Sequence, residues 1–331
     1  MIHPAANDMA TVKAGYASVP VLVLGGAGFI GSWVVRALSA CGATVSVAAR
    51  DAAGAAGALA REGIRARVVA ADVSVAGTVN ALIDTERPAV VFNLAVHGVD
   101  HSERDQVAMA TVNTRLVIDL CGRLATEAAH EWQGVRLVQV GSALEYGPVS
   151  GGLSEDVPPN PTTEYGRSKL LATEHVTRVA AERGLPAVVA RLFTVYGPGE
   201  HEGRLLPSLV SAARTGRRVS LTSGAQRRDF TYVEDAVEGL LRLGAGRISS
   251  GAVVNVATGR MTSVREFAET AASALHLEPD ALEFGALPIR GEEMGHGEVD
   301  LSRLRGLTGW VPQTTIAEGI RRSLEWEHGQ R

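Results

Sequence analysis

Short apolar runs alternate with longer helical patterns through the first 195 residues of the chain. Several runs are continuous rather than alternating, which is typical of strands buried on both faces of a sheet. We predict strands from the runs at 21–24, 44–48, 67–70, 89–94, 135–140 and 187–190. Because segments of helical length separate these runs, the pattern predicts parallel βαβ units and an α/β fold with a doubly wound parallel sheet.

The pattern becomes irregular after about residue 197. Helices are predicted near 203–215, 233–244, 263–276 and 314–328, with short strands at 219–221 and 253–256. We expect a smaller C-terminal α/β domain at the carboxyl ends of the sheet strands, where open α/β sheets bind their ligands. The predicted organisation is an N-terminal extension at 1–18, which we leave out of the fold, a first domain at 19–196 and a mainly substrate-binding domain at 197–331.

A glycine-rich turn joins the first predicted strand to the first helix. Gly25, Gly28 and Gly31 have the spacing G-x-x-G-x-x-G, with Phe29 and Ile30 at the start of the helix. The first glycine permits a tight turn, the second lets the backbone approach a pyrophosphate, and the third allows close packing of helix on strand. The helix N-terminus offers unpaired N–H groups to phosphates. The turn therefore predicts that 19–196 is a Rossmann-type domain that binds a dinucleotide.

The end of the second strand indicates which dinucleotide binds. NAD sites place a carboxylate there for the ribose hydroxyls, whereas NADP sites use an arginine for the 2′-phosphate. Counting from Gly31, Ala49 occupies the carboxylate position and Arg50 follows it. A guanidinium beside a small residue suits a phosphate, so we favour NADP(H) over NAD(H). Asp51 keeps NAD open, because a slip of one residue would return an acid to the site.

A second group of residues combines Ser142, Tyr165 and Lys169. Tyr165 and Lys169 are four residues apart at the start of a predicted helix and therefore share one face. An ammonium group close to a phenol should lower the tyrosine pKa from about 10 and make the phenol an acid or base near neutral pH. Ser142 follows the strand at 135–140, where its hydroxyl can bond a substrate oxygen. We predict that these three residues are catalytic.

With these motifs, the chain resembles the extended short-chain dehydrogenase/reductase family of nucleotide-sugar epimerases, dehydratases and reductases. The resemblance extends from Val21 to about Trp326. The matching segments are GGAGFIG at 25–31, Asp72 after the third strand, Asn93-Leu94-Ala95 after the fourth, Ser142, Tyr165 with Lys169, RLFTVYGPG at 191–199, RRDFTYVED at 227–235 and LTGWVPQTTIAEGI at 307–320.

The resemblance implies roles for further residues around the cofactor. Asp72 would contact the adenine, with Val73 beside it, and Lys169 would bind ribose hydroxyls as well as tune Tyr165. The residues that would line the path to the nicotinamide ribose are Asn93, Leu94 and Ala95.

It also implies a binding site for a nucleotide-diphosphate sugar. Arg228 and Arg290 would grip the diphosphate through bidentate guanidinium bonds. Thr194 stands where the family usually has an asparagine that binds substrate, and a hydroxyl has fewer donors than an amide. His97, shortly after the fourth strand, is a candidate for the wall of the active site.

The residues after Ser142 bear on the reaction. Family dehydratases carry an Asp-Glu pair there, whereas this chain has Ala143 and Leu144, which cannot transfer a proton. Glu145 should point elsewhere, since it lies one position later. We therefore predict NADPH-dependent reduction of the 4-keto group of an NDP-4-keto-6-deoxyhexose. The alternatives are an NAD-retaining nucleotide-sugar 4-epimerase and a dinucleotide sensor without catalysis.

Composition excludes several other classes of function. The chain has 32 Lys+Arg against 36 Asp+Glu, a net charge of −4, which argues against a nucleic-acid partner. Cys41 and Cys121 form no disulfide framework or metal-ligand pair, so we expect no metal site and a cytoplasmic location. We find no apolar run that could span a membrane and no signal peptide. By resemblance we expect a homodimer, formed through the helix at 105–124 and the helix carrying Tyr165.

Overall fold

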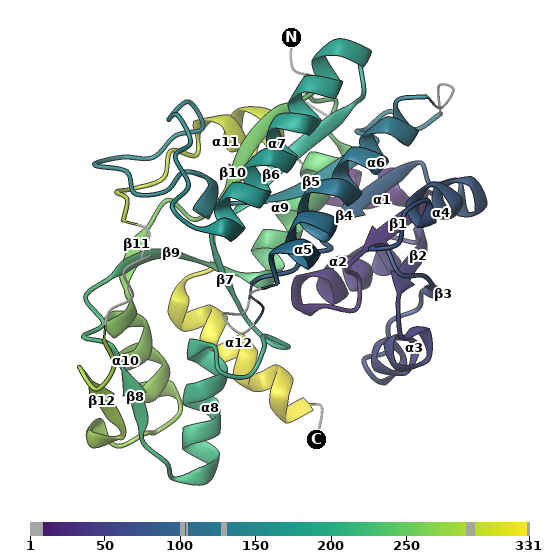
Figure 1. Ribbon diagram of the computed structural model, residues 1–331. Helices are drawn as coiled ribbons and strands as arrows, with labels where there is room; N and C mark the ends of the chain where they lie inside the picture. Colours follow the sequence, from purple (N-terminus) through teal and green to yellow (C-terminus); the bar gives the residue numbers. More distant parts are fainter. Residues whose placement is uncertain (1–8, 100–102, 104, 127–130, 289–294, 330–331) are drawn as a thin grey trace.

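The computed structural model describes residues 9–99, 103, 105–126, 131–288 and 295–329 (Figure 1). Within these ranges a seven-stranded parallel sheet has the strand order β10-β6-β5-β4-β1-β2-β3, a Rossmann-type α/β fold that confirms the predicted class. Its strands are β1 (Pro20–Leu24), β2 (Thr44–Ala49), β3 (Arg67–Ala70), β4 (Val90–Asn93), β5 (Leu137–Ser142), β6 (Ala187–Leu192) and β10 (Ala252–Val256).

Helices cover both faces of this sheet (Figure 1). In β1, Leu22 and Leu24 face a core shared with α4, α6 and α7, whereas Val21 and Val23 face a core shared with α2 and α9. Burial on both sides explains why this strand is a continuous apolar run. The helices are α2 (Phe29–Ala40), α3 (Ala52–Arg61), α4 (Thr78–Glu86), α5 (Gln106–Met109), α6 (Leu116–Leu124), α7 (Glu164–Arg183), α9 (Val233–Ala245) and α11 (Ser302–Thr308).

The segment that we left out of the fold as an N-terminal extension contains a packed helix. α1 (Met9–Tyr16) buries Val12 and Tyr16, and the Tyr16 hydroxyl donates to the carbonyl of Leu241 in α9 at 2.9 Å. The Tyr16 ring lies 5.3 Å from the ring of Trp132. Leaving this segment out of the fold was wrong, since α1 packs against the rest of the chain. The sequence did not reveal this helix because only two of its eight residues are buried, too few to produce an amphipathic pattern.

The chain leaves the large sheet after β6 and builds smaller sheets within the described residues. The elements outside the large sheet are β7 (Thr194–Tyr196), α8 (Leu205–Thr215), β8 (Val219–Leu221), β9 (Arg227–Tyr232), β11 (Met261–Ser263), α10 (Val264–Ala274), the short 3-10 turn Pro279–Ala281, β12 (Leu282–Phe284) and α12 (Ile316–Gly329). The strand expected at 253–256 exists, but as β10 it pairs with β6 in the large sheet rather than in a smaller domain. An apolar run reveals a buried strand but not the sheet that buries it.

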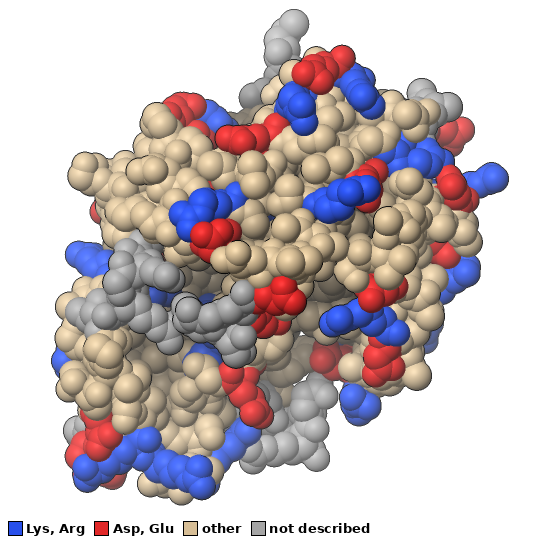
Figure 2. All heavy atoms as spheres, viewed as in Figure 1, with Lys and Arg blue, Asp and Glu red and all other residues tan. Residues whose placement is uncertain are grey.

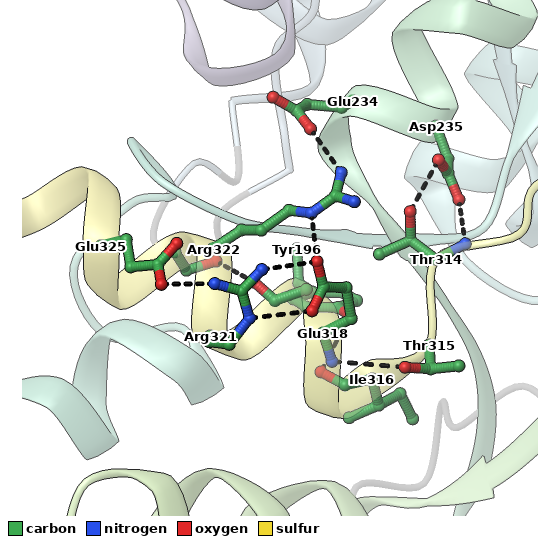
Figure 3. Close-up of polar contacts among 12 residues, drawn as sticks. Tyr196, Glu234, Asp235, Thr314, Thr315, Ile316, Glu318, Arg321, Arg322 and Glu325 are labelled. Atoms are coloured by element: carbon green, nitrogen blue, oxygen red, sulfur yellow. Dashed lines mark hydrogen bonds and ion pairs between the residues drawn. The ribbon is translucent and has the colours of Figure 1, made fainter.

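Two of the matching segments late in the chain contact each other (Figure 3). Asp235, in the first turn of α9, accepts hydrogen bonds from the backbone N–H groups of Gln313 and Thr314 at 3.0 and 2.8 Å. Arg322 of α12 bonds to Glu318 in its own helix and to Glu234 at 3.1 Å. These bonds hold the start of α12 against α9, so the C-terminal helix is fixed to the large sheet.

Charges of both signs are interspersed over the face shown in Figure 2. No helix in the described ranges combines the length and apolar content needed to cross a bilayer. Cys41 and Cys121 are free, buried thiols. The described residues also contain no group of three His, Cys, Asp or Glu side chains that could hold a metal ion.

Candidate active site

The turn between β1 and α2 has the backbone that its glycines predict. Gly25 has a φ of +75°, a conformation that side chains rarely adopt. A Cβ on Gly31 would lie 2.0 Å from the carbonyl oxygen of Gly25, so helix and strand are too close for a side chain there. A Cβ on Gly28 would meet only Gly25, at 3.3 Å, which leaves the outer side of the turn open. Phe29 and Ile30 begin α2, whose N-terminus therefore fits a pyrophosphate.

Asp51 has a local role beyond the end of β2. Its carboxylate caps α3 by accepting a hydrogen bond at 2.9 Å from a backbone N–H in the first turn of that helix. Ala49 is the last residue of β2, and the exposed Arg50 follows it. Hydrogen bonds from Ser74 lower the pKa of Asp72, and the charge of Arg50 adds to this effect. Arg50 and Asp72 are therefore close together at this edge of the sheet.

The segment after β4 lies against the glycine turn. A Cβ on Gly25 would be 2.7 Å from the carbonyl oxygen of Leu94, so the two backbones are in contact. The buried Asn93 amide donates to Gln139 in β5 at 2.8 Å and accepts from the backbone N–H of Ala95 at 3.2 Å. The amide of Asn93 thus joins two strands rather than pointing out of the sheet. The cofactor residues predicted after β3 and directly after β4, namely Asp72, Val73 and Leu94, are half-buried.

The three predicted catalytic side chains meet at the carboxyl end of β5. Ser142 ends that strand, and Tyr165 and Lys169 lie in the first two turns of α7. The Ser142 side chain is close enough to the Tyr165 phenol to lower the pKa of that phenol. The Ser142 oxygen also accepts a bond from the backbone N–H of Leu144 at 3.2 Å. The buried Lys169 ammonium donates to the carbonyl of Val140 at 2.5 Å.

The expected lowering of the Tyr165 pKa is wrong for this structure. Burial raises that pKa, and the charge of Glu145 raises it further, whereas the hydrogen bond with Ser142 acts in the opposite direction. Burial lowers the pKa of Lys169 to about 8. The expectation fails because the ammonium is bonded to the carbonyl of Val140, while burial disfavours a phenolate. Tyr165 therefore holds its proton at neutral pH and can donate it.

Glu145 lies behind Ser142 rather than in the open site. Glu145 is the last residue of the short 3-10 helix η3 (Ala143–Glu145). The Glu145 side chain is fully buried, and its carboxylate lies 2.8 Å from Nε of Arg191 in β6. Ala143 and Leu144 fill the two positions that directly follow the serine. Glu145 thus points away from the open site, as expected, but its partner Arg191 was not predicted. An arginine inside the apolar β6 run was the available signal, since a buried cation needs a buried anion.

A π-helical segment, also missed from the sequence, holds α7 beside His97. η2 (Ala110–Arg115) lies between α5 and α6 and contains Asn113, which is 1% exposed. The Asn113 amide accepts from the backbone N–H of His97 and donates to its carbonyl and to the Ser168 hydroxyl, each at 2.9 Å. Such segments are frequent at functional sites. His97 is therefore fixed close to the start of α7, and its predicted place in the active-site wall stays a prediction.

The predicted substrate residues lie on the small sheet. Thr194 opens β7 and pairs in register with Phe230, two residues beyond Arg228 in β9. Thr194 and Arg228 are both half-buried. Arg290, the other predicted diphosphate ligand, lies outside the described residues.

An ion pair near Tyr165 was also missed. Arg204 lies 3.3 Å from Glu200, whose side chain is 6% exposed. The second carboxylate oxygen of Glu200 is buried and has no hydrogen-bond partner among the described residues. Burial raises the pKa of Glu200 to about 7, although Arg204 opposes this. Glu200 lines a cavity of about 630 Å³ beside α8, and the charge of Arg204 reaches Tyr165.

Known proteins are similar to this chain in sequence and in fold. The model of the NAD dependent epimerase/dehydratase family matches residues 21–257. The chain belongs to this family. Its match covers the large sheet as far as β10, and the family membership confirms the predicted relation to extended short-chain dehydrogenases/reductases.

Individual members of the family are similar along most of their length. The chain is 32% identical over 311 residues to dTDP-6-deoxy-L-talose 4-dehydrogenase (NAD(P)(+)) of Kitasatospora kifunensis, covering 91% of this chain and 93% of that protein. It is 31% identical over 320 residues to UDP-glucose 4-epimerase of Mycolicibacterium smegmatis, covering 92% and 97%. The structure of MoeE5 in complex with UDP-glucuronic acid and NAD matches with a TM-score of 0.80 at 28% identity, covering 94% and 99%.

Proposed function

We propose that this member of the epimerase/dehydratase family reduces the 4-keto group of an NDP-4-keto-6-deoxyhexose with NADPH. The observation that carries the proposal is the group Ser142, Tyr165 and Lys169 at the end of β5, with Ala143 and Leu144 in place of the acids that a dehydratase needs. The similarity to a dTDP-6-deoxy-L-talose 4-dehydrogenase supports a redox reaction at a sugar C4.

NADPH supplies, when bound, the hydride that reduces C4. Tyr165 donates its phenolic proton to the oxygen that becomes the hydroxyl, so the phenol O–H bond breaks as the product O–H bond forms. Ser142 hydrogen-bonds the same oxygen while negative charge develops on it. Lys169, with a pKa of about 8, is mostly protonated at pH 7 and can stabilise the phenolate that Tyr165 leaves behind.

The preference for NADP(H) rests on the end of β2. Asp51 is engaged as the cap of α3, and Ala49 has no group to bond a ribose hydroxyl. Arg50 remains as the cation for a 2′-phosphate beside Asp72. For the cofactor itself, Gly25, Phe29–Gly31, Asp72, Val73 and 93–95 would hold the dinucleotide.

We also propose a homodimer in the cytoplasm, formed through α5, α6 and α7. Leu116, Leu120 and Leu124 belong to the core beneath the sheet and cannot meet a partner. Exposed apolar side chains on the same helices are the better candidates, namely Val107 at 76%, Ile118 at 38% and Leu171 at 54%.

The test is to follow NADPH absorbance during incubation with a 4-keto sugar nucleotide. Stoichiometric oxidation, abolished in Tyr165→Phe while NADPH binding persists, is the expected result. Inversion at C4 without net oxidation would instead support the 4-epimerase, which the 31% identity to a UDP-glucose 4-epimerase keeps as the second candidate. NADPH binding without any turnover would support the sensor.

A further inference from the structure

The carboxylate of Glu145 joins three elements beneath the catalytic residues. It accepts hydrogen bonds from the backbone N–H of Ser142 at 2.8 Å, from the Thr173 hydroxyl of α7 at 2.9 Å and from Nε of Arg191 in β6 at 2.8 Å. We propose that Glu145 is a positioning residue of the reaction, which fixes Ser142 against α7 and places a buried negative charge behind the catalytic residues. This inference rests on the proposed function, because a reductase needs a loaded proton donor.

The local sequence is built to let this carboxylate fold back. Glu145 is the third residue of the one-turn helix η3, and it forms a reciprocal capping box with Ser142. A Cβ on Gly141 would lie 2.7 Å from Oε1 of Glu145 and 3.1 Å from Cγ of Arg191. Glycine at 141 is therefore required for the glutamate to reach the end of β5. The three residues Gly141, Ser142 and Glu145 act as one unit.

Arg191 is held as firmly as the carboxylate that it balances. Its side chain is 4% exposed, and its guanidinium lies 4.2 Å from the ring of Tyr146. The Tyr146 hydroxyl in turn donates to Asn255 in β10 at 2.8 Å. The position of the charge is thus set by β5, β6, α7 and β10 together. A charge fixed by four elements keeps one distance from the catalytic groups.

The groups that face Glu145 define its electrostatic effect. Thr173 of α7 and Arg191 of β6 bond the carboxylate directly, and Tyr146 packs on the Arg191 guanidinium. Tyr165 and Lys169 lie within the electrostatic reach of Glu145, and Tyr165 also lies within that of Arg204. The carboxylate raises the pKa of both Tyr165 and Lys169, because a nearby negative charge disfavours the phenolate and favours the ammonium. Both effects retain protons, which suits donation to a developing alkoxide.

The test uses a feature of the composition. Lysine occurs only at positions 13 and 169, so ¹³C-lysine NMR gives two signals, and a Lys13→Arg variant assigns them. In the unaltered protein we expect Lys169 to titrate near its pKa of about 8. In Glu145→Gln/Arg191→Met, which removes both buried charges together, the midpoint should fall by about one pH unit. The alkaline limb of kcat/KM for reduction should move by the same amount.

Two matched variants separate charge from structure. Glu145→Asp keeps the buried negative charge, and Thr173→Val removes one hydrogen bond to Glu145 without changing that charge. Both variants should therefore lower kcat and leave the titration midpoint of Lys169 nearly unchanged. Single Glu145→Gln, which leaves the Arg191 charge in place, should shift the Lys169 midpoint in the same direction as the double variant. Whichever of these two variants folds decides the matter. An unchanged midpoint would overturn the inference. The NMR titration needs no substrate, so it stays decisive even if the proposed reaction fails.

Discussion

The cofactor preference is tested most directly at Arg50. The residue is exposed at the end of β2, close to Asp72, while its neighbour Asp51 caps α3. If Arg50 binds a 2′-phosphate, Arg50→Ala removes charge-assisted hydrogen bonds that NADH never makes. The structure therefore provides two adjacent substitutions, at 50 and 51, with opposite expected consequences.

Exposure sets the size of the expected effect. Hydrogen bonds to charged groups contribute about 1.5–3 kcal/mol, and the solvent around Arg50 favours the lower half of that range. A loss of about 1.5–2 kcal/mol raises the Kd for NADPH about 10- to 30-fold, whereas the Kd for NADH should change by less than about threefold. Enhancement of reduced-nicotinamide fluorescence gives both Kd values at one fixed ionic strength. Raising the salt concentration should weaken NADPH binding more in the unaltered protein than in Arg50→Ala.

Asp51→Ala is the matched control. Loss of the helix cap should lower the free energy of unfolding by about 1 kcal/mol and leave the ratio of the two Kd values unchanged. Equal weakening of NADPH and NADH by Arg50→Ala would refute the argument for NADP. A selective loss of NADH affinity in Asp51→Ala would show that the Asp51 carboxylate, rather than the Arg50 guanidinium, binds the ribose.

Two further predictions concern stability, both measured by denaturant unfolding. Tyr16→Ala should lower the free energy of unfolding by about 3–5 kcal/mol, because the Tyr16 side chain is fully buried. Tyr16→Phe should lower it by only about 1 kcal/mol, because this variant loses just the hydrogen bond to Leu241. Changes near zero in both variants would mean that α1 is not packed. In the folded state, Glu200 binds a proton up to pH about 7, because burial raises its pKa. When unfolded it binds one only up to the usual glutamate pKa of about 4.5, so the free energy of unfolding falls as the pH rises through that window. The advantage of Glu200→Gln over the unaltered protein should therefore grow by about 3 kcal/mol between these limits, and a constant difference would contradict it.

The parts of the fold that could be predicted are those specified by neighbours in sequence. The β1–α2 turn was predictable because the positive φ of Gly25 and the contact of Gly31 with Gly25 lie within seven residues, although the contact of Gly25 with Leu94 does not. Tyr165 and Lys169 were predictable because one helix places residues four apart on one face. By contrast, α1 depends on contacts of Tyr16 with a helix 225 residues later, for which an eight-residue segment carries no sign.

In the site, too, the positions of residues could be predicted from local spacing, whereas their pKa values depend on residues far apart in the sequence. Spacing locates Tyr165, but its pKa depends on burial and on Glu145, whose charge is held by Thr173 and Arg191 at 28 and 46 residues along the chain. The ammonium of Lys169, one helical turn away, predicted a lowered pKa for Tyr165, but burial and the charge of Glu145 raise that pKa instead. In this chain, the pKa of Tyr165 therefore depends on burial and on a carboxylate that lies outside its own helix.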